Sequence, residues 1–513
     1  MPQAEPRGSA SGSLGSADLK QPRPTRPVSY VILFLWLALA LFLAHSPFFT
    51  LPYFWDELGQ FVPAALDIQR DGAWIPHSTV PNVHPPGVMA WLAGVWTVFG
   101  YSIPATRAAM LFLGAMGALF SFLLAVRLCG GFPGAPAFFA VLFLLLDPLF
   151  YTQSMMAQLD MPAMVGTVLA LWLFLEGRHA LAALACTGLV LAKETGIVLP
   201  FILICALLIR KDGFRNASYY CAPFLVLAAW LLFLWRGTGH LLGDPGFAHY
   251  NVGYALHPVR AGVSLIRRIY YLFVADFRWV GTSALIATRS RWRLFWRTDW
   301  KIAGAFAIAH IVLVSLLGGA ELERYLVPVL PLLYIAMAAA LSLLPTLWRT
   351  AGVIGLGAGL VAGSFLNPPY PFPYENNLAM TDFVELHQKA ARALEQFFPS
   401  ETIYTAWPLT AALRRPEFGY VKHGLQATET SDLHISTLSR LDPRAVHVLV
   451  LYSRTWEPSW GVLQNSSIRS FLGQFYEYEP QMNARQCRDK LGLTQVGRWE
   501  RRGQWVEIYA KQR

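Results

Sequence analysis

Charged residues are scarce in this chain of 513 residues. Asp, Glu, Lys and Arg make up 14% of the chain, and hydrophobic residues make up 55%. Soluble domains average about 25% charged residues. A soluble protein with so little charge would expose large apolar patches and aggregate. The shortage of charge therefore excludes an ordinary soluble enzyme and indicates an integral membrane protein.

Cysteine is also rare, with five residues in the whole chain. No C-x-x-C spacing occurs, and Cys129, Cys186, Cys205 and Cys221 lie in or beside apolar segments. The sequence therefore offers neither a disulfide framework nor a cysteine metal site. An H-E-x-x-H motif is missing as well. No cofactor is defined, and a divalent metal stays open with its ligands unknown.

The basic residues indicate how the chain crosses the membrane. The formal net charge is +10. Basic residues gather in short loops between apolar segments, as in Arg289–Lys301, which is the positive-inside pattern of membrane proteins. We therefore expect membrane lipids, and not nucleic acid, around this charge. A basic, Ser-, Gly- and Pro-rich tail over residues 1–28 is expected in the cytoplasm.

The apolar segments predict about eleven transmembrane helices between residues 29 and 366. Ala135–Tyr151 and Val263–Ala287 are each expected to be one span. An outer loop covers residues 47–104, and within it Gly87–Phe99 is apolar but too short to span. An odd number of spans places the region after residue 366 outside the cytoplasm.

Residues 367–513 have an ordinary globular composition. Val446–Tyr452 is a continuous apolar run of the buried-strand type. Thr381–Phe398 has helical spacing, and Thr494–Tyr509 reads as two strands around Arg502-Gly503. The expected fold class is thus an α-helical polytopic membrane protein with a small, soluble C-terminal α/β domain.

Polar side chains recur in the predicted outer loops, and each allows a functional and a structural interpretation. Asp56 and Glu57 are adjacent carboxylates that suit a general base, or else a hydrated loop or helix cap. His84 precedes Pro85-Pro86 and can meet a phosphate or a metal, or merely occupy a rigid turn. Asp160 begins an apolar run and either faces a polar cavity or caps a helix.

Further charged groups lie at the edges of the predicted spans. The charges of Lys193 and Glu194 are energetically unfavourable at membrane depth unless they are paired or lie in a cavity. A loop rich in His and Arg suits an anionic ligand, and a lipid phosphate would satisfy the two arginines at its end. Arginine also offers two-point recognition of phosphate. These candidates are His257, Arg260, Arg267, Arg268, Arg324 and Tyr325.

Carboxylates and cations are thus expected on one side of the membrane. A carboxylate can take the proton of an acceptor hydroxyl, and cations can hold the negative charge of a departing lipid phosphate. The transferred sugar would pass through an oxocarbenium-like state. The pattern favours transfer of a sugar from a lipid phosphate.

The ordered motifs resemble a known family. They are the acidic pair, Pro85-Pro86 before a short helix, Leu159-Asp160-Met161-Pro162, Lys193-Glu194-Thr195-Gly196 and Arg324-Tyr325 with Pro328 and Pro331. This set is similar to bacterial GT-C membrane glycosyltransferases related to the dolichyl-phosphate-mannose protein mannosyltransferases and the lipid A aminoarabinose transferases. Val83-His84 stands where the aminoarabinose branch has Glu-Lys, so the phosphate-binding lysine and the metal-site glutamate of that branch are missing there.

The resemblance implies an inverting transfer from a polyprenyl-phosphate sugar to a lipid, glycan or protein acceptor at the bacterial inner membrane. Asp56 would be the base, with Glu57 beside it and Asp160 as a second catalytic carboxylate. The donor phosphate would be bound by His84, Lys193, Arg267, Arg268, Arg324 and Tyr325, with Glu194, His257 and Arg260 elsewhere in the cavity.

Two other functions remain open. A transporter or flippase of lipid-linked sugars would also have many spans, but transporters often show internal repeats, and none is evident here. A non-catalytic assembly protein would not need Asp56 and Asp160.

Overall fold

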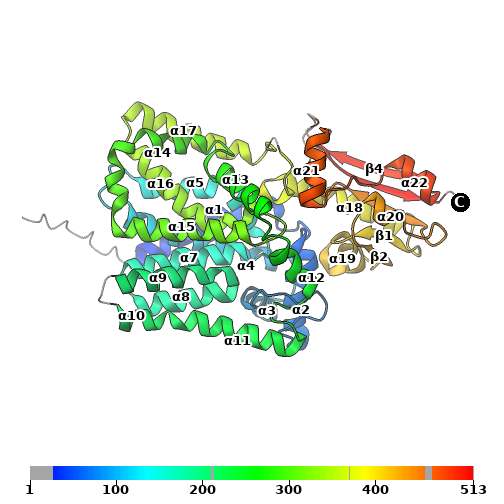
Figure 1. Ribbon diagram of the computed structural model, residues 1–513, viewed down its shortest axis with the longest axis horizontal. Coiled ribbons are helices and arrows are strands. Elements are labelled where there is room, and N and C mark those ends of the chain that lie inside the picture. The colour runs from blue at the N-terminus through cyan, green and yellow to red at the C-terminus, as the bar shows by residue number, and fades with distance from the viewer. Residues whose placement is uncertain (1–26, 210–212, 369, 457–460, 462–464, 512–513) are drawn as a thin grey trace, which may run out of the picture.

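A computed structural model describes residues 27–511, apart from 210–212, 369, 457–460 and 462–464. A helical bundle and a smaller unit with a β-sheet lie end to end (Figure 1). The first described residues and α10 (Phe214–Tyr219) lie at the end of the bundle opposite the sheet. Of the predicted tail over residues 1–28, all but the last two residues lie outside the described part.

The bundle is built from the apolar runs of the sequence. By length and composition alone, five of the described helical stretches can cross a membrane, or six if one bent pair is counted. Four shorter apolar helices accompany them, and the eleven spans remain a prediction. The main helices are α1 (Pro27–His45), α4 (Ile103–Leu128), α7 (Asp160–Leu175), α8 (His179–Ala192), α9 (Val198–Ile209), α11 (Cys221–Thr238), α15 (Thr298–Leu316), α16 (Leu330–Ser342) and α17 (Thr346–Gly363).

Two predicted spans are each divided into two helices in the structure. Ala135–Tyr151 contains α5 (Pro136–Leu146) and α6 (Pro148–Met155), which meet at 66°. Asp147 lies between them and accepts the Phe150 N–H at 2.8 Å, so it caps α6. Val263–Ala287 contains the end of α13 (Pro258–Phe273) and all of α14 (Trp279–Ala287). Apolar length does not reveal such breaks.

The two breaks meet at a buried ion pair. Arg278, at the start of α14, donates to Asp147 Oδ2 at 2.5 Å and to the Tyr334 hydroxyl at 2.9 Å. Its third nitrogen donates to the Tyr271 carbonyl at 2.9 Å. Because every guanidinium nitrogen has a partner, this pair connects two broken helices without leaving an uncompensated charge.

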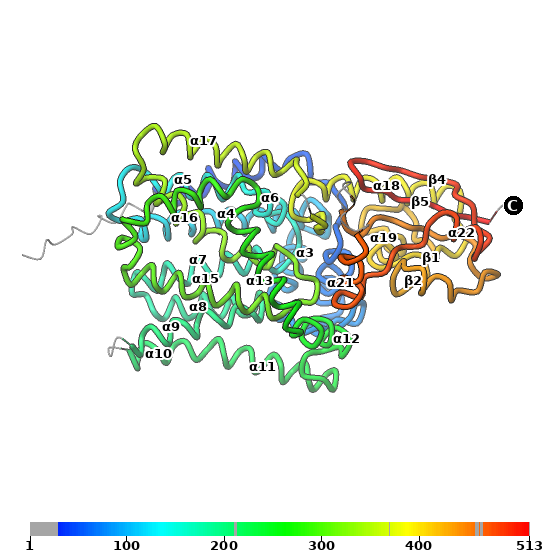
Figure 2. Tube along the Cα trace, turned by 45° about the horizontal axis from the view of Figure 1, so that its top comes forward, coloured from blue at the N-terminus to red at the C-terminus, as the bar shows by residue number. Residues whose placement is uncertain are grey.

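The outer loop lies where the bundle meets the sheet. It contains a π-helical turn η2 (Glu57–Phe61), α2 (Val62–Asp71) and α3 (Gly87–Phe99). The predicted short helix after Pro85-Pro86 is confirmed, with the same bounds. Both views place α3 and α12 (Pro245–Ala248) at this junction (Figure 1; Figure 2).

The C-terminal unit is a mixed five-stranded sheet in the order β2-β1-β3-β5-β4. The central strand β3 (Val448–Tyr452) is buried along its whole length and pairs parallel with β1 and antiparallel with β5. The predicted strand, the predicted helix and the predicted terminal hairpin are confirmed. The remaining elements include α18 (Ala379–Phe397), β1 (Ile403–Ala406), α19 (Leu409–Arg414), β2 (Ala427–Thr430), α21 (Ser466–Tyr476), α22 (Ala484–Leu491), β4 (Thr494–Arg501) and β5 (Gln504–Ala510).

Direct contacts join this unit to the outer loop. The Tyr420 hydroxyl donates to the Tyr53 carbonyl at 2.7 Å, and the Tyr101 hydroxyl donates to the Glu417 carbonyl at 3.0 Å. The Trp407 indole lies against Gly59, where an added Cβ would overlap it. The acidic loop and the C-terminal unit are therefore packed as one piece.

Gly59→Ala should loosen this junction, because the new methyl group overlaps the Trp407 ring. We expect limited proteolysis between residues 367 and 378 to release the C-terminal unit several times faster than in wild type. Gly94→Ala on α3 is the matched control, since nothing lies within 4 Å of its added Cβ. Equal cleavage of both variants would contradict the close contact.

Sidedness is testable with one introduced thiol. After Ser466→Cys, an impermeant maleimide should label α21 in intact cells, because the predicted odd number of spans places this unit outside the cytoplasm. The exposed native Cys221 is the first residue of α11 and follows α10, which lies at the opposite end of the bundle, so it should be labelled only after permeabilisation. The reverse pattern would overturn the predicted orientation.

Candidate functional site

Arg324 is the centre of a cluster of charged side chains. It lies in η6 (Glu323–Val329), and 4% of its surface is exposed. Nη2 donates to Asp56 Oδ2, Nη1 donates to Glu375 Oε2 at 2.9 Å, and Nε lies 3.4 Å from Asp160 Oδ2. One cation thus faces three carboxylates from segments far apart in the sequence. We call Asp56, Asp160, Lys193, Arg324 and Glu375 the Arg324 cluster.

Lys193 is the second cation of the Arg324 cluster. Its Nζ donates to Asp160 Oδ1 at 2.6 Å and lies 4.2 Å from the centre of the Tyr325 ring. Asp160 makes no side-chain cap for α7, so its interpretation as a helix cap was wrong. Its two oxygens instead face Lys193 and Arg324, which is the arrangement expected of a buried, paired carboxylate.

Asp56 is held in place by an unusual backbone. Trp55, the residue before it, has a φ of 45°, which a bulky side chain rarely adopts. The Trp55 ring packs edge-on against Trp407 at 5.6 Å and lies 5.8 Å from Phe383. Such conformations persist only where the surroundings enforce them, and they concentrate at functional sites.

Glu57 points away from its neighbour Asp56. It is fully buried and pairs with Arg107 of α4, whose Nη2 lies 3.2 Å from Oε2. Its oxygens also accept the N–H groups of Phe54 at 2.8 Å and Ala157 at 2.6 Å. The adjacent carboxylates therefore face separate cations, and Glu57 anchors the loop instead of sharing a site with Asp56.

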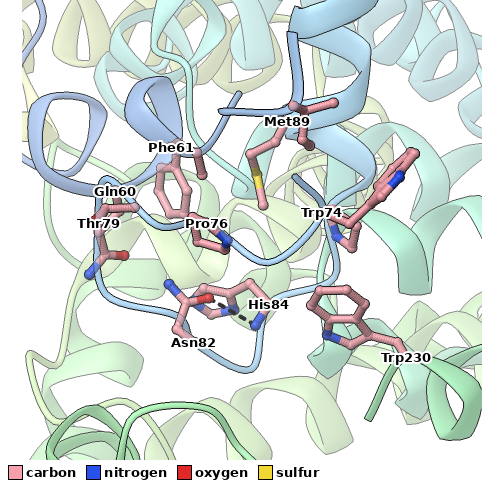
Figure 3. Close-up of a pocket in the computed structure, with 12 residues that line it drawn as sticks. Gln60, Phe61, Trp74, Pro76, Thr79, Asn82, His84, Met89 and Trp230 are labelled. Carbon is pink, nitrogen blue, oxygen red and sulfur yellow. Dashed lines mark hydrogen bonds between the residues drawn. The ribbon is translucent and has the colours of Figure 1, made fainter. Parts of the chain in front are cut away.

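His84 and Glu194 form a neighbouring pair. His84 Nδ1 lies 2.7 Å from Glu194 Oε2. Lys193 and Glu194, adjacent in sequence, thus pair with different partners. Figure 3 shows His84 in a mostly apolar pocket beside Asn82, with Trp230 close by. Other residues drawn there are Gln60, Phe61, Trp74, Pro76, Thr79 and Met89.

The remaining predicted cations have protein partners. Arg267 Nε donates to Glu323 at 2.5 Å, and Arg268 donates to the carbonyls of Leu322 at 3.0 Å and Val314 at 2.8 Å. Arg260 donates to the carbonyls of Tyr254 and Gly319.

The same helix, α13, approaches the C-terminal unit. His257 caps α13 by accepting the Val259 N–H at 3.3 Å, and its ring lies 5.4 Å from that of Phe475 on α21. The Arg260 guanidinium lies 5.1 Å from the ring of Tyr476, also on α21. These two residues therefore face α21, and their described partners, which are Val259, Phe475, Tyr254, Gly319 and Tyr476, all lie outside the Arg324 cluster.

Sequence reasoning missed three polar residues of this region. Arg107 had a signal, because an arginine inside an apolar run needs a buried partner. Gln158, whose Nε2 lies 3.4 Å from Glu375 Oε2, directly precedes the motif Leu159-Asp160-Met161-Pro162. No sequence pattern pointed to Glu375, since it lies in an irregular Pro- and Tyr-rich linker.

A candidate set of metal ligands lies in the outer loop. Among the described residues, one group could offer three metal ligands, and it consists of Asp67, Asp71 and His77 in the outer loop. Asp67 Oδ2 already accepts the N–H groups of His77 and Ser78, each at 2.9 Å. These contacts explain the group as the closure of a loop.

Solved structures with a similar fold are known. ArnT from Cupriavidus metallidurans bound to undecaprenyl phosphate matches with a TM-score of 0.55 and 15% identity, over 94% of this chain and 98% of that one. The chain has the GT-C fold. The Archaeoglobus fulgidus oligosaccharyltransferase in complex with Zn and sulfate matches with a TM-score of 0.50 and 12% identity, over 82% and 67% of the two chains.

The similarity lies in the fold and does not extend to the sequence. No family model matches the chain, and no curated protein matches it. The resemblance read from the ordered motifs is nevertheless confirmed at the level of fold, across both the bundle and the C-terminal unit. The apolar helices and the membrane proteins that share this fold identify an integral membrane protein.

Glu57 and Asp56 should differ sharply in their effect on stability. Glu57→Gln leaves Arg107 buried without a counter-charge, which costs about 3–5 kcal/mol in the free energy of unfolding. Asp56→Asn should cost much less, because Arg324 keeps Glu375 and Asp160. Denaturant unfolding in detergent measures both, and equal losses would contradict the division of roles between the two carboxylates.

Proposed function

We propose that this protein is an inverting glycosyltransferase. It moves a sugar from a polyprenyl-phosphate donor to a hydroxyl of a lipid, glycan or protein acceptor on the extracytoplasmic face of the bacterial inner membrane. The observation that carries the proposal is the Arg324 cluster, in which Asp56 and Asp160 share one buried arginine beside Lys193. Two cations and several carboxylates suit a reaction that releases a phosphate and removes a proton.

The donor class is supported by the shared fold and by charge. A C. metallidurans protein of this fold has been crystallised with undecaprenyl phosphate. A phosphate oxygen can replace a carboxylate on Arg324 or Lys193 without leaving the cation unpaired, since both groups accept charge-assisted hydrogen bonds. We therefore infer that the donor phosphate binds Arg324 and Lys193, with His84 and Tyr325 beside them.

The reaction is a single displacement. The acceptor hydroxyl gives its proton to the Asp56 carboxylate, and its oxygen forms a bond to the anomeric carbon. The bond between that carbon and the phosphate oxygen breaks, and the phosphate leaves with the electron pair. Arg324 and Lys193 stabilise the charge that develops on it. Asp160 holds these two cations in position.

Asp56→Asn should lower sugar transfer by about 10²–10⁴-fold, the usual contribution of a general base. The assay is transfer of radiolabelled hexose from a polyprenyl-phosphate donor to a total membrane extract by purified protein. Donor binding should change little, because the asparagine does not remove Arg324 or Lys193. The product would identify the acceptor.

Asp71→Asn is the matched control, because Asp71 is an exposed aspartate of the same outer loop and pairs with His77. It should transfer sugar at the wild-type rate. Normal transfer by the Asp56 variant would overturn its role as the base. Donor binding without transfer by the wild-type protein would favour a transporter of lipid-linked sugars.

A further inference from the structure

Glu375 enters the Arg324 cluster from the linker that precedes the C-terminal unit. It lies in a short 3₁₀ turn, η7 (Tyr374–Asn376), and 2% of its surface is exposed. Thr152 of α6 donates to its carbonyl at 2.7 Å. Asn376 donates to Glu323 at 2.9 Å. The turn is thus bound on both sides to the helical bundle.

The Glu375 carboxylate has incomplete partners. Oε2 accepts from Arg324 Nη1 at 2.9 Å and from Gln158 Nε2 at 3.4 Å. Among the described residues, Oε1 has no hydrogen-bond partner, and neither has Oε1 of Gln158. A buried carboxylate oxygen without a donor is costly. This arrangement is far less complete than that of Glu57, whose two oxygens are both bonded.

The charges around Glu375 do not balance. Arg324 on η6 and Lys193 at the end of α8 face Asp56 before η2, Asp160 on α7 and Glu375 itself. Three ionised carboxylates against two cations leave one excess negative charge in a buried place. Protonation of Glu375 would remove that excess. Burial raises the pKa of Glu375 to about 7, opposed by Arg324 and assisted by Asp56.

We propose that Glu375 is a positioning residue that controls how much of the positive charge of Arg324 is available to the donor phosphate. The inference rests on the proposed function. When Glu375 is ionised, it holds Nη1 of Arg324 and adds a negative charge beside the phosphate. When it is neutral, Nη1 of Arg324 is released and can donate to the phosphate, while Asp56 and Asp160 still hold Nη2 and Nε. Because Glu375 belongs to the linker before the C-terminal unit, donor binding depends on how that unit packs against the bundle.

The direction of the pH dependence follows because Glu375 and the donor phosphate compete for Arg324. Glu375 carries its proton below about pH 7 and loses it above. Donor affinity should therefore fall as the pH rises through 7. A polyprenyl-phosphate sugar is a phosphodiester with one constant negative charge in this range, so the step cannot come from the donor. Glu375→Gln imitates the protonated form and should bind with the wild-type low-pH affinity at every pH.

The test is the dissociation constant of a short-chain polyprenyl-phosphate mannose, measured between pH 5.5 and 8.5 on the full-length protein in nanodiscs. The dissociation constant of the wild type should rise at least about fivefold across this range, which is the lower end of typical couplings between sites. Glu375→Gln should show no step, while Glu375→Asp, which keeps a carboxyl group, should retain one. Glu385→Gln is the control, since Glu385 is a half-exposed carboxylate that pairs with Arg501 in the C-terminal unit. It should bind like wild type at every pH.

The outcomes separate this inference from the proposed function. A pH step that persists in Glu375→Gln, or a wild type without any step, overturns the role of Glu375. Loss of the step in Glu375→Gln, with the step kept in Glu375→Asp, supports this role. Binding by Glu375→Gln with the wild-type low-pH affinity shows that the loss is not a folding defect. Transfer by the same samples is measured in parallel. Binding with the expected step but without transfer would overturn the glycosyltransferase and leave the role of Glu375 in phosphate binding standing. No binding at any pH would overturn both.

Discussion

The buried charge of Arg324 is the constraint on which the rest of this site depends. An arginine with 4% of its surface exposed destabilises the folded state unless carboxylates surround it. Here those carboxylates come from the outer loop, the start of α7 and the linker before the C-terminal unit. Satisfying one cation therefore requires that three distant segments meet at a single point. The organisation of the end of the bundle that meets the C-terminal unit follows from that requirement.

The acidic pair shows how one short motif can serve two purposes. Asp56 and Glu57 are adjacent, yet the left-handed backbone at Trp55 and the turn that follows send them to different cations. Glu57 and Arg107 connect the loop to α4 and to the segment around Ala157. This rigid support leaves Asp56 at the edge of the Arg324 cluster, where it is partly accessible. A reactive carboxylate benefits from such a support, because its orientation is then set by its neighbours.

The sequence predicted much of the fold and part of the site. Apolar runs located the helices, and the strand over Val446–Tyr452 and the short helix Gly87–Phe99 followed from period and length. Lys193 was singled out as a costly charge near the membrane and Asp160 as a residue facing a polar cavity or capping a helix, and the structure pairs them. The breaks beside Asp147 and Arg278 were not predicted, because an apolar run has the same composition whether its helix is straight or bent. The partners of Lys193 and Glu194 could not be read from the sequence, since Lys193 pairs with Asp160 of α7 and Glu194 with His84 of the outer loop.

By itself the sequence determined the class of protein, since scarce charge and long apolar runs allow a membrane bundle and little else. It also determined which polar residue types lie at the ends of the apolar segments. Only the tertiary structure decided how those charges combine. A buried ion needs the nearest counter-charge in space, and that neighbour is set by packing, not by order along the chain. For this reason Glu375, in a linker without any motif, lies against Arg324, while Glu57, beside Asp56 in sequence, belongs to a different ion pair.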